Sequence, residues 1–255
     1  MKILFVGNSF AVDTTEHAAN VALSMGFENI KIGTLFVGGC SIVRHYNHAV
    51  GDMGVYVYYV NEGQGWSSTE GVKISDAVRS DDWDWIAIQH GTSCESRYTS
   101  IECYEKLAPL VDYLKELAPK AKIAFNLTWM GESTFQHHEI ISYGGNIALM
   151  RQKLEEVTAK VMEDNPKIDV LIPTGTAIEN ARTSKIGLLT RDCYHLSMDK
   201  GRYIAALTLI STLSGISPEK AAWAPEGVDE YTKKVALEAV KNAQAKPLEI
   251  TRSFL

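Results

Sequence analysis

The sequence predicts an α/β fold, a three-layer sandwich in which helices cover both faces of a central parallel sheet. Two patterns predict this class. Short runs of consecutive apolar residues, of which Lys2–Val6 is the first, are typical of strands buried on both faces. They alternate with longer segments of helical periodicity, as in a parallel sheet with crossover helices. The length of 255 residues fits one such unit, so we expect a single domain over 1–255.

Five segments are expected to form the parallel strands, because each is short, mostly apolar and bounded by turn residues. In chain order they are Lys2–Val6, Asn29–Phe36, Trp85–Gln89, Lys122–Thr128 and Asp169–Ile172. The segments between and after them show helical spacing and helix-ending residues. They are Thr15–Met25 with Gly26 at its end, Ile42–Ala49, Tyr98–Leu117 before Pro119, Ile147–Asp164, Thr176–Arg182, Lys200–Ser214 and Asp229–Ala243.

One segment interrupts this alternation. Val55–Val60 and Gly71–Ile74 are strand-like runs on either side of a glycine-rich turn. This pattern predicts a β-hairpin, inserted over residues 54–75 at the rim of the sheet.

Composition excludes several classes of function. The net charge is −6 and no run of basic residues stands out, which argues against nucleic acid as a partner. No apolar run reaches the roughly 18 residues of a membrane span, so we expect no membrane partner. As it stands the chain reads as cytoplasmic, or as periplasmic or secreted if a leader was removed. The four cysteines show no paired spacing, and we expect reduced thiols at Cys40, Cys94, Cys103 and Cys193.

Polar residues gather where the predicted strands end. In an open parallel sheet, ligands bind beyond the carboxyl ends of the strands. Four segments lie there, namely Gly7–Phe10, Val37–Ser41, Gln89–Ser93 and the loop Thr190–Leu196. The first supplies a serine hydroxyl directly after the first strand, and the last supplies a carboxylate three residues before an imidazole.

These residues have the chemistry of a serine nucleophile. A serine hydroxyl reacts only when a base takes its proton, and the base needs an acceptor on its far nitrogen. The spacing Asp192-x-x-His195 allows Asp192 to reach Nδ1 of His195, so that Nε2 faces Ser9. Ser197 can cap the following helix and hold the loop rigid. We therefore predict Ser9, Asp192 and His195 as the catalytic residues.

The same segments resemble the blocks of the SGNH (GDSL-like) hydrolases. Gly7-Asn8-Ser9-Phe10 resembles the first block and Asp192-Cys193-Tyr194-His195 the last, while Gly38-Gly39 is similar to the second, whose glycine amide helps form the oxyanion hole. The match is nearest to a bacterial branch with "GNSF" early and "LTRDxYHLS" late. The resemblance implies an esterase or O-deacetylase that cleaves a small or carbohydrate-linked ester through an acyl-enzyme, without a cofactor. It also implies that the backbone amides of Ser9 and Gly39 bind the oxyanion.

The third block departs from the family pattern, which has an asparagine after the third strand. Gln89 is our candidate for the missing donor, with Ser93 as the alternative, although Gln89 could instead hold a neighbouring loop. We expect Asn8, His90 and Trp129 to contribute to substrate binding. Asn8 could instead orient its turn, and Trp129 could belong to the core.

Alternative interpretations remain open at this point. The missing asparagine is compatible with a catalytically weak or inactive module that binds a carbohydrate or another ligand. His45-x-x-His48 and His137-His138-Glu139 suggest a metal, but neither has a third ligand at a recognisable spacing, so we expect no metal site. We expect Arg182 and Arg191 to pair with carboxylates and Cys193 to pack. The sequence does not indicate an oligomeric state.

Overall fold

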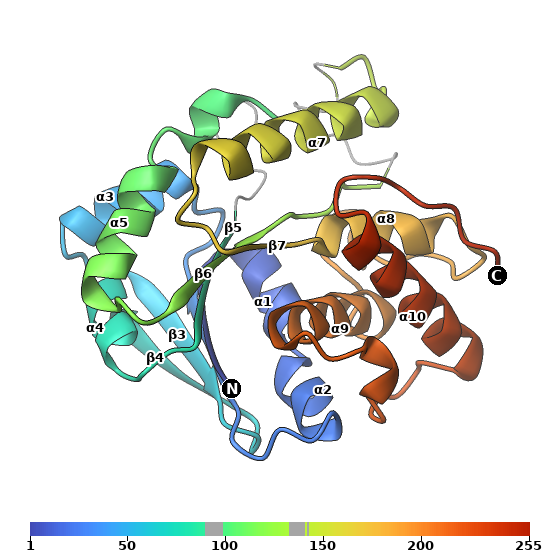
Figure 1. Cartoon of the computed structure of the whole chain (residues 1–255), viewed down its shortest axis with the longest axis horizontal. Coiled ribbons are helices and arrows are strands. Elements are labelled where there is room, and N and C mark those ends of the chain that lie inside the picture. Colours follow the sequence, from blue (N-terminus) through green and yellow to red (C-terminus); the bar gives the residue numbers. More distant parts are fainter. Residues whose placement is uncertain (90–98, 133–140, 142) are drawn as a thin grey trace.

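The computed structural model describes residues 1–89, 99–132, 141 and 143–255. Within these residues a seven-stranded sheet runs through the centre in the order β4-β3-β2-β1-β5-β6-β7. Helices cover both of its faces (Figure 1), so the predicted α/β class is confirmed. β1 has a neighbour from the following part of the chain on each side, β2 and β5. The strand order therefore reverses at β1, which is where ligands bind in sheets of this kind.

Six of the seven strands lie in the apolar runs that predicted them, whereas β4 begins at Trp66, five residues before the expected Gly71, because its side chains are mostly polar and exposed. The strands are β1 (Lys2–Gly7), β2 (Lys31–Phe36), β3 (Tyr56–Asn61), β4 (Trp66–Val72), β5 (Trp85–Gln89), β6 (Lys122–Asn126) and β7 (Val170–Ile172). β2, β1, β5, β6 and β7 are parallel to one another. The carboxyl ends of these five strands therefore meet at one edge of the sheet.

Helices are divided between the two faces. They are α1 (Ser9–Thr15), α2 (Ala18–Ser24), α3 (Ile42–Val50), α4 (Ile74–Arg79), α5 (Leu107–Leu117), α7 (Ile147–Asp164), α8 (Thr174–Arg182), α9 (Lys200–Ser214) and α10 (Glu230–Ala245), with 3-10 turns η1 (Ile101–Tyr104) and η2 (Pro218–Lys220). Ile3 and Phe5 of β1 pack with α1, α2, α8, α9 and α10. Leu4 and Val6 point the other way and pack with α3, α4, α5 and α7. This alternation gives the protein two apolar layers, one on each face of the sheet.

The segment expected to be a hairpin contributes β3 and β4, which pair antiparallel with each other. β3 also pairs antiparallel with β2, so the hairpin extends the main sheet. The second strand ends at Val72, and Ile74 begins α4 where a strand residue was expected. Ser67, Ser68, Thr69 and Glu70 are exposed on β4. Polar side chains of this kind protect an edge strand from pairing with another chain.

Two helix boundaries differ from the sequence prediction. The helix expected from Tyr98 begins only at Leu107, which makes Pro109 its third residue. Proline lacks an N–H and is tolerated only in the first turn, so a helix starting at Tyr98 would have placed it in the interior. The helix expected over Thr15–Met25 is α2, which begins only at Ala18, and a separate helix that was not predicted, α1, precedes it with Asn8 as its N-cap.

The expectation of reduced thiols is wrong at one position. Cys103 is disulfide-bonded, whereas Cys40 and Cys193 are reduced thiols, as expected. Spacing along the chain did not reveal this bond because it depends on how the loops fold in space.

Candidate active site

The Ser9 hydroxyl lies at the turn from β1 into α1. Asn8 is the N-cap of α1, and its Oδ1 accepts the Phe10 N–H at 3.0 Å. This turn is tight: a Cβ on Gly7 would lie 2.6 Å from the Cβ of Ala11. Ser9 is therefore the first helical residue, partly exposed at the carboxyl edge of the sheet.

The second part of the site is the loop 190–196. Thr190 and Leu196 form an isolated antiparallel bridge, and Cys193 between them has a φ of 64°. Asp192 closes the turn, because its Oδ1 accepts the N–H groups of Tyr194 at 3.1 Å and His195 at 2.6 Å. An aspartate that hydrogen-bonds the backbone two and three residues ahead fixes a turn of this kind. Asp192 therefore has two roles. One carboxylate oxygen fixes the backbone of the loop, and the other binds the His195 ring.

Three side chains form a continuous hydrogen-bonded row. Ser9 Oγ lies 2.8 Å from His195 Nε2, and His195 Nδ1 lies 2.7 Å from Asp192 Oδ2. Partial burial raises the pKa of the Asp192 carboxyl, but hydrogen bonds from the His195 side chain and backbone outweigh it, so the pKa lies below its usual value. The ionised carboxylate therefore favours a proton on Nδ1 and leaves Nε2 as the acceptor that faces Ser9.

A buried carboxylate that the sequence analysis missed joins the two parts of the site. Asp13 of α1 is fully buried, and its Oδ2 accepts the N–H of Leu196 at 2.8 Å. Its Oδ1 accepts from Arg191 at 3.0 Å and from Arg202 of α9 at 2.9 Å. A buried carboxylate needs such partners to stay ionised. Asp13 thereby fixes the residue after His195 against the helix that carries Ser9.

Both arginines near the loop pair with carboxylates, as expected. Arg182 contacts Glu132 at 2.9 Å and Glu179 at 2.7 Å, and Arg191 contacts the buried Asp13. Glu132 also accepts the Thr190 hydroxyl at 3.0 Å, and its own N–H donates to the Cys193 carbonyl at 2.8 Å. The loop is therefore held from several sides.

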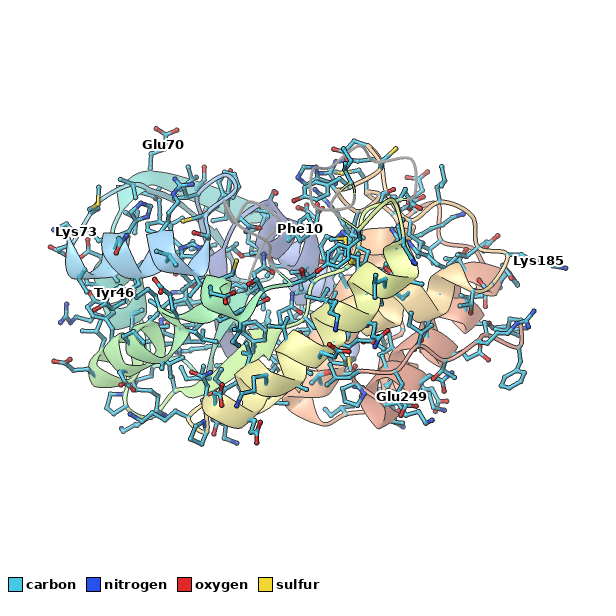
Figure 2. All side chains as sticks on the ribbon, turned by 90° about the horizontal axis from the view of Figure 1, so that it is seen from above. Phe10, Tyr46, Glu70, Lys73, Lys185 and Glu249 are labelled. Carbon is cyan, nitrogen blue, oxygen red and sulfur yellow. The ribbon has the colours of Figure 1, made fainter. Side chains whose placement is uncertain are left out.

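Trp129 is a buried residue that supports the loop 190–196. Its predicted role in substrate binding is therefore wrong. Its side chain is fully buried, and its Nε1–H donates to the Tyr194 carbonyl at 2.8 Å. Its ring stacks on Phe10 with 4.3 Å between centroids, and Phe10 in turn contacts Tyr194 at 4.7 Å. Phe10 lies at the centre of the molecule in Figure 2, whereas Glu70 and Lys185 lie at its margin. Trp129 therefore has no surface left for a substrate.

The roles predicted for Asn8 and Gln89 are corrected in the same way. Asn8 is almost fully buried, and its Nδ2 donates to the Cys40 carbonyl at 3.1 Å. The Nε2 of the fully buried Gln89 donates to Asn8 Oδ1 at 3.0 Å, and its Oε1 accepts from Asn126 at 3.1 Å. Asn126 Oδ1 accepts the Thr174 hydroxyl at 2.6 Å. These four residues form a buried amide ladder under the site, so Gln89 does not point into the pocket.

The glycine turn after β2 is tied to the Ser9 turn. Cys40 N–H donates to the Val37 carbonyl at 3.1 Å, and Gly39 has a φ of 57°, which suits glycine. Because Asn8 binds the Cys40 carbonyl, the turn that carries Gly39 is fixed beside Ser9. The remaining predicted residues, His90 and Ser93, lie outside the described residues.

The histidines considered for a metal have another role. His45 and His48 of α3 hydrogen-bond the Tyr56 hydroxyl of β3 at 2.7 and 3.2 Å, which ties this helix to the hairpin. Across residues 1–89, 99–132, 141 and 143–255, no three histidine, cysteine or acidic side chains gather as a metal site. His137, His138 and Glu139 lie outside those ranges. The helices in the described ranges are all too short or too polar to span a membrane.

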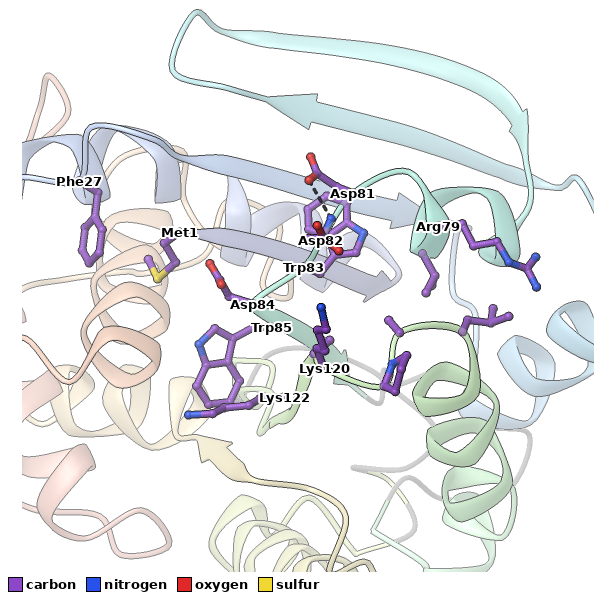
Figure 3. A pocket seen from close by; sticks show the side chains of 15 residues that line it. Met1, Phe27, Arg79, Asp81, Asp82, Trp83, Asp84, Trp85, Lys120 and Lys122 are labelled. Carbon is purple, nitrogen blue, oxygen red and sulfur yellow. Dashed lines mark hydrogen bonds between the residues drawn. The ribbon is translucent and has the colours of Figure 1, made fainter.

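A hollow of about 870 Å³ lies at the opposite end of the sheet (Figure 3). It is lined by residues at or just before the starts of β1, β5 and β6, among them Met1, Asp81, Trp85 and Lys122. Since Ser9 follows the carboxyl end of β1, this hollow is not part of the site.

Comparison with known proteins agrees with this architecture. A crystal structure of a DUF4886 family protein from Bacteroides uniformis is 31% identical, with a TM-score of 0.92 over 99% of this chain and 97% of that one. A putative SGNH hydrolase from Slackia heliotrinireducens is 19% identical, with a TM-score of 0.56 over 84% and 98%. An acetylxylan esterase from Geobacillus stearothermophilus is 16% identical, with a TM-score of 0.54 over 83% and 93%.

The two more distant structures show that the chain has the fold of the SGNH hydrolases. No protein with a curated description matches the sequence. The model of a domain of unknown function, DUF4886, matches residues 2–243. The chain therefore belongs to the DUF4886 family.

Proposed function

We propose that this protein is a serine hydrolase that cleaves a carboxylic ester through an acyl-enzyme. One observation carries the proposal: Ser9 Oγ, His195 Nε2 and Nδ1, and Asp192 Oδ2 form a row with distances of 2.8 and 2.7 Å. A nucleophile, its base and the group that orients the base need this arrangement, whatever the fold.

In the proposed reaction, Ser9 Oγ attacks the ester carbonyl carbon while its proton passes to His195 Nε2. The tetrahedral intermediate collapses when His195 returns that proton to the leaving alcohol, which leaves an acyl group on Ser9. A water molecule, activated by His195 in the same way, then attacks the acyl group and restores the serine. Asp192 holds the ring in the required tautomer and stabilises the imidazolium that forms twice in the cycle.

Backbone amides are the proposed donors to the oxyanion. The Ser9 N–H is at the first position of α1, where helical amides have no partner within the helix. The Gly39 amide belongs to the turn that Asn8 ties beside Ser9. Gln89 is removed from this set, because its amide is committed to the buried ladder. Ser93 stays the candidate for the third donor.

The substrate proposed for this reaction is a small ester or an O-acylated carbohydrate. The acetylxylan esterase among the structural neighbours supports the second class. The site is also open: the side chains of His195 and Asp192 are 25% and 49% exposed. An open site of this kind can accept an alcohol that extends into solvent.

A fluorophosphonate probe tests the proposal directly. The probe should label the wild-type protein at Ser9, identified by mass spectrometry, and should not label Ser9→Ala. Ser68, which is exposed on β4, serves as a matched control, so Ser68→Ala should label like the wild type. Labelling that persists in Ser9→Ala would reject this nucleophile. A wild-type protein that takes up no probe would favour the non-catalytic binding module instead.

A further inference from the structure

A groove lies beside the candidate site, between α1 and the β3–β4 hairpin. Its volume is about 220 Å³. It is lined by Val12, Thr15 and Glu16 of α1 and by Thr34, Tyr59 and Trp66 of strands β2, β3 and β4. Because Thr15 and Thr34 are buried, they form the floor, and the other four residues form the walls.

The lining residue of the groove that is nearest to Ser9 along α1 is Val12. Val12 lies three residues after Ser9, so both share one face of α1, about 4.5 Å apart along the helix axis. On the other side, Phe36 is the register partner of Gly7, and its ring centroid is 6.1 Å from that of Tyr59. The groove thus lies along the face of α1 that also carries Ser9, and it extends from Val12 to Glu16.

Four polar residues of the groove, Thr15, Thr34, Trp66 and Glu16, are already paired within the protein. The Thr15 hydroxyl donates to the Ala11 carbonyl at 2.8 Å and accepts from the Thr34 hydroxyl at 2.9 Å. Trp66 Nε1–H donates to the Glu16 carbonyl at 3.2 Å. The Glu16 carboxylate pairs with Arg202 of α9 at 3.2 Å. A hydroxyl-rich ligand would find few partners here, whereas an apolar chain would contact Val12 and two aromatic rings.

We propose that this groove binds the acyl chain of the substrate and that the protein prefers medium-chain acyl groups to acetyl. The inference rests on the proposed serine hydrolase function. The hydrogen bond from Trp66 to the Glu16 carbonyl closes the far end. The distance from Ser9 to Glu16 along the helix is about 10 Å, which matches an acyl chain of about six to eight carbons.

A series of p-nitrophenyl esters from acetate to laurate measures this preference. For the wild type, kcat/KM should rise about fourfold for each methylene that enters the groove and should fall beyond octanoate. Trp66→Ala, which removes the closing side chain, should move the optimum to longer esters. A wild-type kcat/KM that falls steadily from acetate to octanoate would overturn the proposal.

Val12→Phe fills the groove but leaves in place its paired polar residues, Thr15, Glu16, Thr34 and Trp66. It should lower kcat/KM for hexanoate and octanoate esters at least about tenfold, and much more than for the acetate ester. Val50→Phe is the matched control, since it makes the same change at an exposed position on the end of α3, and it should behave like the wild type. An equal loss for acetate and octanoate in Val12→Phe would contradict a chain-specific role.

Binding without turnover separates this inference from the proposed function. Calorimetry on Ser9→Ala should show octanoate binding at least about tenfold more tightly than acetate, and adding Val12→Phe should remove that difference. If octanoate binds in this way but no ester is hydrolysed, the groove assignment stands and the hydrolase proposal fails. If acetate esters are hydrolysed through Ser9 while octanoate shows no advantage in binding or turnover, the groove assignment fails alone.

Discussion

Ser9 and His195 are the residues on which the proposed chemistry depends most directly. Ser9→Ala and His195→Ala should each lower kcat/KM on short-chain aryl esters by at least about a thousandfold, because the attack loses its nucleophile or its base. Far-UV circular dichroism should match the wild type, since both side chains are partly exposed. Undiminished turnover in Ser9→Ala would contradict the assignment.

Asp13 supports the site through charge. In Asp13→Asn the buried side chain keeps its shape but loses the negative charge that Arg202 and Arg191 face. We expect the free energy of unfolding to fall by about 2–3 kcal/mol, because the buried Arg202 guanidinium loses the nearer of its two carboxylate partners and keeps only Glu16. Urea denaturation measures the change, and ester turnover should drop with it because Leu196 loses an anchor beside His195.

Asp112→Asn is the matched control for this change. Asp112 pairs with Lys167 at 2.6 Å, but both side chains are more than half exposed. Exposed ion pairs contribute little, so the free energy of unfolding should change by less than about 1 kcal/mol. Equal effects in the two variants would mean that burial is not what makes Asp13 important.

For single residues, contacts in the site can be predicted from the sequence only where the spacing along the chain or the order of the strands constrains them. Asp192 and His195 are three residues apart, and Ser9 follows a central strand, so their meeting follows from the chain order. Gln89 ends one strand and Trp129 follows another, but the pattern does not indicate which way a side chain points. Asp13 was missed, although a lone carboxylate within an otherwise apolar and hydroxylated turn of helix is itself a signal of a buried ion pair.

Among the elements, α8 packs very closely against the backbone that follows β6. A Cβ on Gly175, the second residue of this helix, would lie 2.1 Å from the Thr128 carbonyl oxygen. Backbone cannot move aside cheaply, so Gly175→Ala should lower the free energy of unfolding by about 1–3 kcal/mol. Gly38→Ala is the control, because the nearest atom to its Cβ would be 3.9 Å away. Thermal unfolding of both variants measures the difference, and a stable Gly175→Ala would show that α8 can shift.

Strands and helices differ in how well their positions could be predicted from the sequence. The parallel strands were predicted because both of their faces are buried, which leaves a continuous apolar run. Short helices such as α1 and α4 were missed, because six or seven residues hold too few turns for a period to emerge. The start of α5 is decided by one residue, Pro109, whose effect on the helix is local and could have been recognised from the sequence.

Across the whole molecule, Asp81 ties together the amino ends of the two central strands. It pairs with Lys2 of β1 at 2.5 Å and Lys31 of β2 at 3.0 Å (Figure 3 labels Asp81). The hydrogen bond from Lys2 is the main cause that lowers the pKa of Asp81 from 3.8 to about 2. Because the folded pKa is the lower one, the stabilisation is present above pH 3.8 and is lost as the pH falls through about 2.

Asp81→Asn should therefore destabilise the protein in a pH-dependent way. We expect the free energy of unfolding to be lower than that of the wild type by about 1–2 kcal/mol at pH 6, after allowance for screening. The difference should shrink between pH 4 and pH 2. Denaturation curves over this range measure it, and a difference that stays constant would mean that the charge of Asp81 is not responsible.

The contacts between α1 and the loop 190–196 also determine at which stage of folding the candidate site is assembled. They join residues 178 to 186 positions apart. Contacts of such separation form late, because the intervening chain must first collapse, and on the ribosome Ser9 emerges long before His195. The serine therefore stays unreactive throughout synthesis. In a refolding experiment, the recovery of ester turnover would therefore report when the whole chain has folded.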